Sequence, residues 1–199
     1  MNTKTSPRKI TSLPRLAALG CAAAMLTNSA SAAFHLWTVR ELFTNLDGSQ
    51  QFIELFCPTG GQTQVGGQVL QVTDQAGTTT HTFTVPANVS GDTTNHAYLI
   101  ATSGFAAAAG AVPPNGTISS GFLFPAGGTI SFFGTPTSNA YTALPTNGVL
   151  SRALPGGTNQ TNTPQNYAGQ IGQVPEPTTW ALLGLGGIGC CFLMRRRAA

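Results

Sequence analysis

Short runs of apolar, β-branched and aromatic residues, separated by Gly, Pro, Asn and Asp, fill the chain from Phe34 to about Leu154. Runs of this length with turn residues between them predict β-strands joined by loops. The predicted strands are Leu36–Phe43, Gln51–Cys57, Gln68–Thr73, Thr79–Val85, His96–Thr102, Gly121–Phe124, Thr129–Phe133 and Val149–Ala153. The Ala-rich Phe105–Ala111 has room for only a turn or two of helix. Many short strands without helices between them indicate an all-β sandwich or barrel.

Alternation within Gln51–Cys57 places Glu54 on the face opposite Ile53 and Leu55, because successive side chains of a strand point to opposite sides. Asp47-Gly48 lies between the first two predicted strands and is a strong turn signal. We therefore expect the first two strands to be neighbours. Residues 33–154 together form the predicted β-domain, and about 120 residues suffice for a core of that kind.

Beyond Pro155 the composition shifts to Gly, Asn, Gln, Thr and Pro, and no charge follows until Glu176. Such a composition predicts a flexible polar linker over residues 155–173. A linker of about 20 residues, at about 5–6 Å × √n, would hold the domain about 25 Å from whatever anchors the chain.

The first 32 residues have the pattern of a secretory signal peptide. A basic region ends at Arg15, and the apolar run Leu16–Leu26 that follows is too short to span a membrane. Ala30-Ser31-Ala32 supplies the small residues that a signal peptidase accepts, which predicts cleavage before Ala33. A lipoprotein signal at Ala18–Cys21 is the alternative.

The tail, residues 174–199, has three parts in a fixed order: the triplet Pro175-Glu176-Pro177, an uncharged apolar run, and three arginines, Arg195, Arg196 and Arg197. The prolines favour an extended, accessible triplet. The run Thr178–Met194 has 17 residues and would measure about 25 Å as a helix. A hydrocarbon core is about 30 Å thick, so the tail predicts a short membrane span.

This order of triplet, apolar run and basic end resembles the PEP-CTERM sorting signal of proteins exported by Gram-negative bacteria. The resemblance implies that a membrane-embedded exosortase recognises the triplet, cuts near it and passes the protein to the cell surface or the exopolysaccharide matrix. Pro175, Glu176, Pro177 and the three arginines would then be recognition residues. A permanent anchor that ends in positive-inside arginines is the alternative.

A second resemblance concerns the β-domain, over roughly Leu36 to Ala101. Segments there are similar, in order, to the opening strands of the lamin-tail domain, an immunoglobulin-like β-sandwich often appended to exported bacterial proteins. These segments are Val39–Leu42, Asp47-Gly48, Phe52–Leu55, Gly67–Asp74, His81–Pro86 and Tyr98–Ala101. The resemblance implies an interaction module of that fold.

Charge is concentrated at the two ends of the chain. The formal net charge of the whole sequence is +3, but Ala33 to Pro177 holds two basic residues, Arg40 and Arg152, against six acidic ones, a net charge of −4. Nucleic-acid binding needs a basic face to neutralise phosphates, so the composition argues against a nucleic-acid partner.

Few residues of the chain suggest a catalytic, metal-binding or cofactor-binding site. Cys57 is the single cysteine between the two ends and is expected as a small buried residue. The three histidines, His35, His81 and His96, do not have the spacing of metal ligands, and no cofactor or metal is predicted. The glycine pattern at Gly184–Gly189 lies inside the apolar tail and is not expected to bind a nucleotide.

The sequence therefore predicts a non-enzymatic envelope protein with a structural or adhesive role. Its expected partners are signal peptidase, exosortase and the membrane, with exopolysaccharide or surface proteins as further candidates. Two alternatives stay open. Oxygen-bearing residues at Asn45–Ser49 suggest a calcium- or glycan-binding module. Glu41 and Glu54, on adjacent predicted strands, suggest a small periplasmic hydrolase, since a glycosidase needs two carboxylates that face one cleft.

Overall fold

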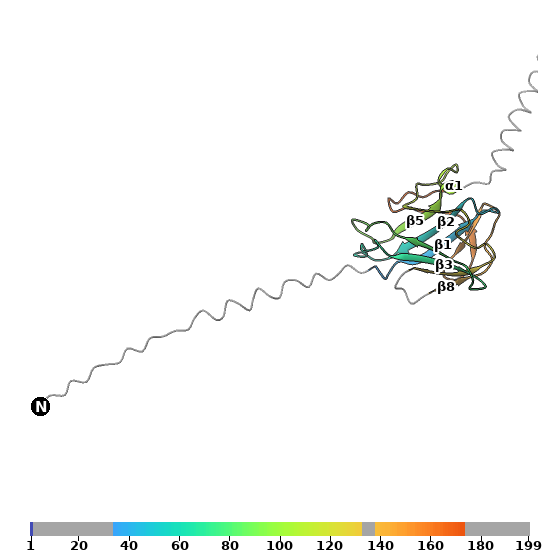
Figure 1. Cartoon of the computed structure of the whole chain (residues 1–199). Coiled ribbons are helices and arrows are strands. Elements are labelled where there is room, and N and C mark those ends of the chain that lie inside the picture. The colour runs from blue at the N-terminus through green and yellow to red at the C-terminus, as the bar shows by residue number, and fades with distance from the viewer. Residues whose placement is uncertain (2–33, 133–137, 174–199) are drawn as a thin grey trace, which may run out of the picture. The chain divides into compact units, whose positions relative to one another are not determined.

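The computed structural model describes residues 1, 34–132 and 138–173, and these residues form mostly strands and loops (Figure 1). The predicted signal peptide with Ala30, Ala32 and Ala33, and the predicted membrane span in 174–199, lie outside the described residues. The described β elements belong to one compact unit, Ala32–Ala199. The all-β class predicted from the strand pattern is confirmed.

The described part of the chain contains ten strands and one short helix. In chain order they are β1 Thr38–Thr44, β2 Gln51–Cys57, β3 Val69–Asp74, β4 Thr80–Thr84, β5 His96–Thr102, α1 Ser103–Ala106, β6 Gly116–Ile118, β7 Gly128–Phe132, β8 Asn139–Tyr141, β9 Leu150–Ala153 and β10 Asn159–Thr161.

These strands form two sheets. Within the described residues, a six-stranded sheet has the order β10-β9-β1-β2-β5-β6 and a four-stranded sheet has the order β4-β3-β7-β8. Successive pairs of strands alternate between the two sheets along the chain. The first, third and fifth pairs belong to the six-stranded sheet, and the second and fourth pairs belong to the four-stranded sheet. Neighbouring strands are antiparallel except for β5 and β6, which are parallel.

One apolar core joins the two sheets. Each sheet contributes the side chains of one face to a single cluster of buried residues. From the six-stranded sheet these include Leu42, Ile53, Leu55 and Ile100; from the four-stranded sheet they include Leu70, Val72, Ile130 and Phe132. The sheets therefore pack face to face, and removal of this apolar surface from water is the main stabilising contribution.

The second face of the six-stranded sheet is also covered. The rings of Phe43 and Phe52 stack with centroids 5.1 Å apart, and Phe105 of α1 packs edge-on against Phe52 at 5.2 Å. Gly104 permits this close approach, because a Cβ at that position would lie 2.4 Å from the carbonyl oxygen of Ser49. The segment around α1 thus forms a second, smaller core on the outside of the sheet.

Most of the predicted strands are confirmed. β2 and β5 have the predicted bounds, and β1, β3, β4, β7 and β9 start and end within two residues of theirs. The prediction of a strand at Gly121–Phe124 is wrong. The Gln51 side chain accepts from the Leu123 N–H at 3.0 Å and donates to the Leu123 carbonyl at 3.0 Å, so this buried loop obtains from a side chain the hydrogen bonds that a strand would supply.

The structure also differs from the predicted linker at residues 155–173. β10 pairs with β9, and the residues that follow run on across the protein. We name residues 162–173 the strap. Asn162 and Asn166 of the strap are buried, at 0% and 4% exposure. The polar composition serves hydrogen bonds to the domain rather than hydration of a free chain, so the β-domain extends to Gln173.

This extension makes a testable prediction. A chain from Ala33 to Thr158 should lose at least about 2 kcal/mol of unfolding free energy relative to a chain from Ala33 to Gln173, because it loses β10 and hydrogen bonds to buried carboxylates, each of about 1.5–3 kcal/mol. Urea unfolding followed by near-UV circular dichroism measures the difference. Equal urea midpoints and slopes for the two chains would instead support the predicted flexible linker over residues 155–173.

Candidate functional site

The strap leads directly to the predicted sorting signal. It ends at Gln173, two residues before Pro175, while the triplet itself and Arg195, Arg196 and Arg197 lie outside the described residues. Within residues 34–132 and 138–173 no helix has the length and apolarity needed to cross a membrane. Among the described residues, the candidate site is therefore the surface of the β-domain to which the strap binds.

Two buried carboxylates lie beneath the strap. Glu41 of β1 and Glu54 of β2 are register partners, with exposures of 1% and 0%. A register irregularity between Val39 and Glu41 accompanies this pairing. The structure thus brings together the two glutamates that the sequence placed on adjacent strands.

Both carboxylates accept hydrogen bonds from the strap backbone. The N–H of Thr163 donates to Glu41 Oε1 at 3.0 Å, and the N–H of Gln165 donates to Glu54 Oε2 at 2.6 Å. Arg40 Nε donates to Glu54 Oε1, and Arg40 Nη2 donates to the side-chain oxygen of Gln165 at 3.1 Å. We call this arrangement the carboxylate clamp.

Electrostatics at the clamp are set mainly by burial. Removal of Glu54 from water raises its pKa, while the hydrogen bond and charge of Arg40 act in the opposite direction. The N–H of Gln165 also lowers the pKa of Glu54, and the neighbouring charge of Glu41 raises it. The net pKa of Glu54 is raised, because desolvation outweighs its partners.

Aromatic and amide side chains hold the middle of the strap. The Tyr167 ring lies 6.4 Å from that of Trp37 and 5.0 Å from that of His96, and its hydroxyl donates to the carbonyl of Ser90 at 2.9 Å. Asn115 Oδ1 accepts from the Tyr167 N–H at 3.0 Å and from the Leu99 N–H of β5 at 2.9 Å. One amide oxygen therefore joins the strap to the sheet.

The two carboxyl groups that a hydrolase would require, those of Glu41 and Glu54, have a structural role in the clamp. Each of the four carboxylate oxygens of Glu41 and Glu54 accepts a hydrogen bond from the protein. A glycosidase mechanism needs two carboxyl groups that face a cleft with room for the sugar and water. In this conformation the strap occupies the space in front of both groups.

The Asn45–Ser49 turn is closed by its own side chains. Asp47 Oδ1 accepts from the N–H of Ser49 at 3.0 Å and from its hydroxyl at 2.7 Å, and these bonds lower the pKa of Asp47. Asn45 Oδ1 accepts from the N–H of Gln50 at 3.0 Å. Among the described residues, no three His, Cys, Asp or Glu side chains gather as metal ligands would.

Cys57 is fully buried, as predicted from the sequence, and its thiol donates to the carbonyl oxygen of Thr59 at 3.0 Å. His81 stacks on Phe124 with ring centroids 4.8 Å apart. His96 packs on Tyr167, as described above. These side chains therefore serve packing and local hydrogen bonds in this structure.

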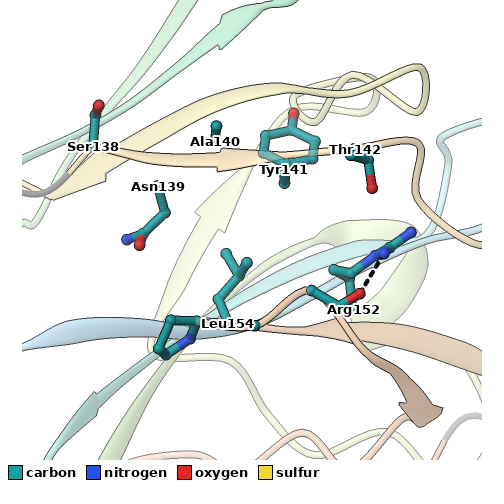
Figure 2. Close-up of a pocket in the computed structure, with 10 residues that line it drawn as sticks. Ser138, Asn139, Ala140, Tyr141, Thr142, Arg152 and Leu154 are labelled. Carbon is teal, nitrogen blue, oxygen red and sulfur yellow. Dashed lines mark hydrogen bonds between the residues drawn. The ribbon is translucent and has the colours of Figure 1, made fainter.

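A surface pocket of about 520 Å³ lies between β8 and the turn that follows β9. Asn139 and Leu154 point into the gap from opposite sides, and Arg152 lies at one end (Figure 2). The two Nη groups of Arg152 donate to the carbonyls of Gly157 and Ala143, while its Nε is buried without a hydrogen-bond partner. The pocket offers one cation and neutral polar groups.

The strap residues of the site were missed by sequence reasoning. Thr163, Gln165 and Tyr167 lie in a segment without charge, and the first two bind the carboxylates through backbone N–H groups that no sequence pattern marks. The available signal was the pair Glu41 and Glu54 itself, because two acids on adjacent strands with one arginine beside them require further donors if buried.

The raised pKa of Glu54 predicts a pH dependence. Because the pKa of Glu54 is higher in the folded protein than in the unfolded chain, protonation of Glu54 stabilises the folded state. This stabilisation is fully present below the ordinary pKa of 4.5 and is lost as the pH rises through the raised pKa. The unfolding free energy should therefore increase as pH falls from 7 towards 4.5, and Glu54→Gln should flatten this slope.

Urea unfolding at several pH values checks the slope. Asp74→Asn is the matched control. Asp74 accepts hydrogen bonds from Thr78, which lower its pKa, so its contribution to the unfolding free energy changes with pH only below this window. The same slope in Glu54→Gln as in the unaltered protein would contradict the prediction.

Comparisons with known proteins bear on the tail. A model of the PEP-CTERM protein-sorting motif matches residues 173–197, which begin at the last residue of the strap and end at the third arginine. No curated protein and no solved structure matches the chain. The order of triplet, apolar run and arginines is thereby assigned to a known motif, and the tail of this chain carries a PEP-CTERM protein-sorting motif.

Proposed function

We propose that this protein is a non-enzymatic structural or adhesive component of the cell surface or exopolysaccharide matrix of a Gram-negative bacterium. The observation that carries the proposal is the sorting motif at residues 173–197, which supports export and sorting by an exosortase-type system. In this proposal signal peptidase cuts before Ala33, and the exosortase recognises Pro175-Glu176-Pro177 while the apolar run holds the chain in the membrane.

We further propose that the β-domain is an immunoglobulin-like sandwich of the lamin-tail kind. Its strand order supports this assignment: β1, β2 and β5 are neighbours in one sheet and β3, β7 and β8 in the other. The immunoglobulin fold groups its strands A, B and E and its strands C, F and G in the same way. β9 and β10 extend the first sheet beyond β1.

The outward face of the four-stranded sheet suits contact with a neutral polysaccharide. Thr80, Thr82 and Thr84 of β4 are exposed at alternate positions, and Thr82 is opposite the exposed Gln71 of β3. Exposed Thr129 of β7 continues the same face. Hydroxyl and amide groups on the exposed face of a sheet can form direct and water-mediated hydrogen bonds with sugar hydroxyls.

We rank the two alternatives below this proposal. Calcium or glycan binding at the Asn45–Ser49 turn would have to compete with the hydrogen bonds that close the turn. Hydrolysis by Glu41 and Glu54 would require the strap to leave the carboxylate clamp.

Sorting predicts a shortened C-terminus. Intact-mass measurement of protein from the cell surface and the medium should show a chain that lacks Arg195–Arg197, because the exosortase cuts near the triplet. Replacement of Pro175, Glu176 and Pro177 by alanine should leave the full-length chain in the membrane fraction. An intact arginine end on the mature surface protein would support a permanent anchor instead.

Adhesion predicts a role for the threonine hydroxyls. Replacement of Thr80, Thr82 and Thr84 by the isosteric valine should weaken co-sedimentation with purified exopolysaccharide at least about tenfold, because each lost hydrogen bond costs about 0.5–1.5 kcal/mol. Thr161→Val, at an exposed threonine of β10, is the matched control. Unchanged binding by the triple variant would exclude this face.

A further inference from the structure

The strap fixes the point at which the chain leaves the folded domain. The N–H of Gln173 donates to the carbonyl of Gly110 at 3.1 Å, and the N–H of Gly172 donates to that of Pro164 at 2.9 Å. The packing is tight, since a Cβ on Gly172 would lie 2.6 Å from the Gly110 oxygen. The exit therefore lies against the loop that follows α1.

Little chain separates this exit from the apolar run of the sorting signal. Five residues lead from Gln173 to Thr178, which at no more than about 3.6 Å per residue span at most about 18 Å. A domain of about 135 residues has a radius of gyration of about 14 Å and hence a diameter of about 35 Å. The exit is thus held within about half a domain diameter of the membrane-embedded run.

The loop that follows α1 and the end of the strap have no charged residues and carry small apolar groups at the exit. Ala106, Ala107 and Ala109 are exposed, and so is Pro113 on the far side of the loop. Ile171 of the strap is 68% exposed, two residues before the exit. The sequence has no charged residue between Asp92 and Arg152, so this part of the chain brings no charge that would have to be desolvated near lipid.

We propose that this exit surface, Ala106–Pro113 together with Ile171, lies against the headgroup region of the bilayer before the sorting signal is cut. The short covalent reach supplies the proximity, and the exposed methyl groups are compatible with the interface. The inference rests on the proposed sorting, in which the apolar run is held in the membrane.

The chemistry of the surface also predicts how weak the contact is. Alanine methyl groups and one isoleucine bury little apolar area, so the contact depends on the high local concentration that the attached span provides. Once the signal is cut, the domain should leave the membrane. Because the exit surface has no Lys or Arg, the contact should not require anionic lipid.

Fluorescence quenching in vesicles tests the proposal with the chain from Ala33 to Ala199, which lacks the predicted signal peptide. Cys190 and Cys191 are replaced by alanine, and the buried Cys57 is kept. A single cysteine at Ala109 or Ile171 carries a nitrobenzoxadiazole label, and the quencher is a lipid with a nitroxide on its headgroup. The matched control is a label at Thr82 of β4, which is exposed on the other sheet.

Labels at Ala109 and Ile171 should be quenched at least about twofold more than the label at Thr82, equally in neutral and in anionic vesicles. A chain that ends at Gln173 should show no quenching. Gly172→Ala, which disturbs the exit, should reduce the difference between Ala109 and Thr82.

Equal quenching at Ala109 and Thr82, in a chain that floats with the vesicles, would overturn the contact while leaving the sorting proposal intact. Quenching at Ala109 that requires an exosortase in the vesicles would assign the surface to the enzyme and also overturn lipid contact. A chain from Ala33 to Ala199 that does not float with vesicles would overturn both this inference and the membrane-held stage of sorting.

Discussion

The carboxylate clamp is the interaction on which the organisation of the domain depends. Burial of two carboxylates side by side costs several kcal/mol per ion unless charge and hydrogen bonds compensate. Arg40 supplies one positive charge to Glu54, and the N–H groups of Thr163 and Gln165 supply the remaining donors. The sheet therefore depends on the strap, because the strap backbone donates hydrogen bonds to the two buried carboxylates.

The clamp also connects folding to sorting. The strap begins after β10 and ends at the first residue of the sorting motif, so the hydrogen bond between Gln173 and Gly110 lies two residues before Pro175. A protein whose strap is not docked would present its sorting signal on a longer and looser chain. The docked strap instead holds the folded domain close to the start of the sorting motif.

Amide side chains repeatedly act in place of a neighbouring strand. Gln51 satisfies both backbone groups of Leu123, Asn115 joins Leu99 to Tyr167, and Asn45 caps the turn before β2. This explains a composition with many polar residues and only 8% charged ones. Neutral donors and acceptors can be buried at modest cost when they are paired, whereas charges cannot.

Local pattern was sufficient for β2 and β5, because each is a run of seven residues whose side chains are buried in the sheet. It was insufficient for β6, β8 and β10, each of three residues, which are strands only because a partner lies beside them. The sequence predicted that Glu41 and Glu54 lie on adjacent strands, but it gave neither their register, which includes an irregularity between Val39 and Glu41, nor their use as a clamp.

The sequence by itself determined the class of the fold and the sorting motif, since strand periodicity and the order of triplet, apolar run and arginines are both written in consecutive residues. Only the tertiary structure decided the end of the domain, the purpose of the two glutamates and the position of the chain exit. The physical reason is distance along the chain: the hydrogen bonds that dock the strap join residues 122 and 111 positions apart, and no local signal specifies such partners.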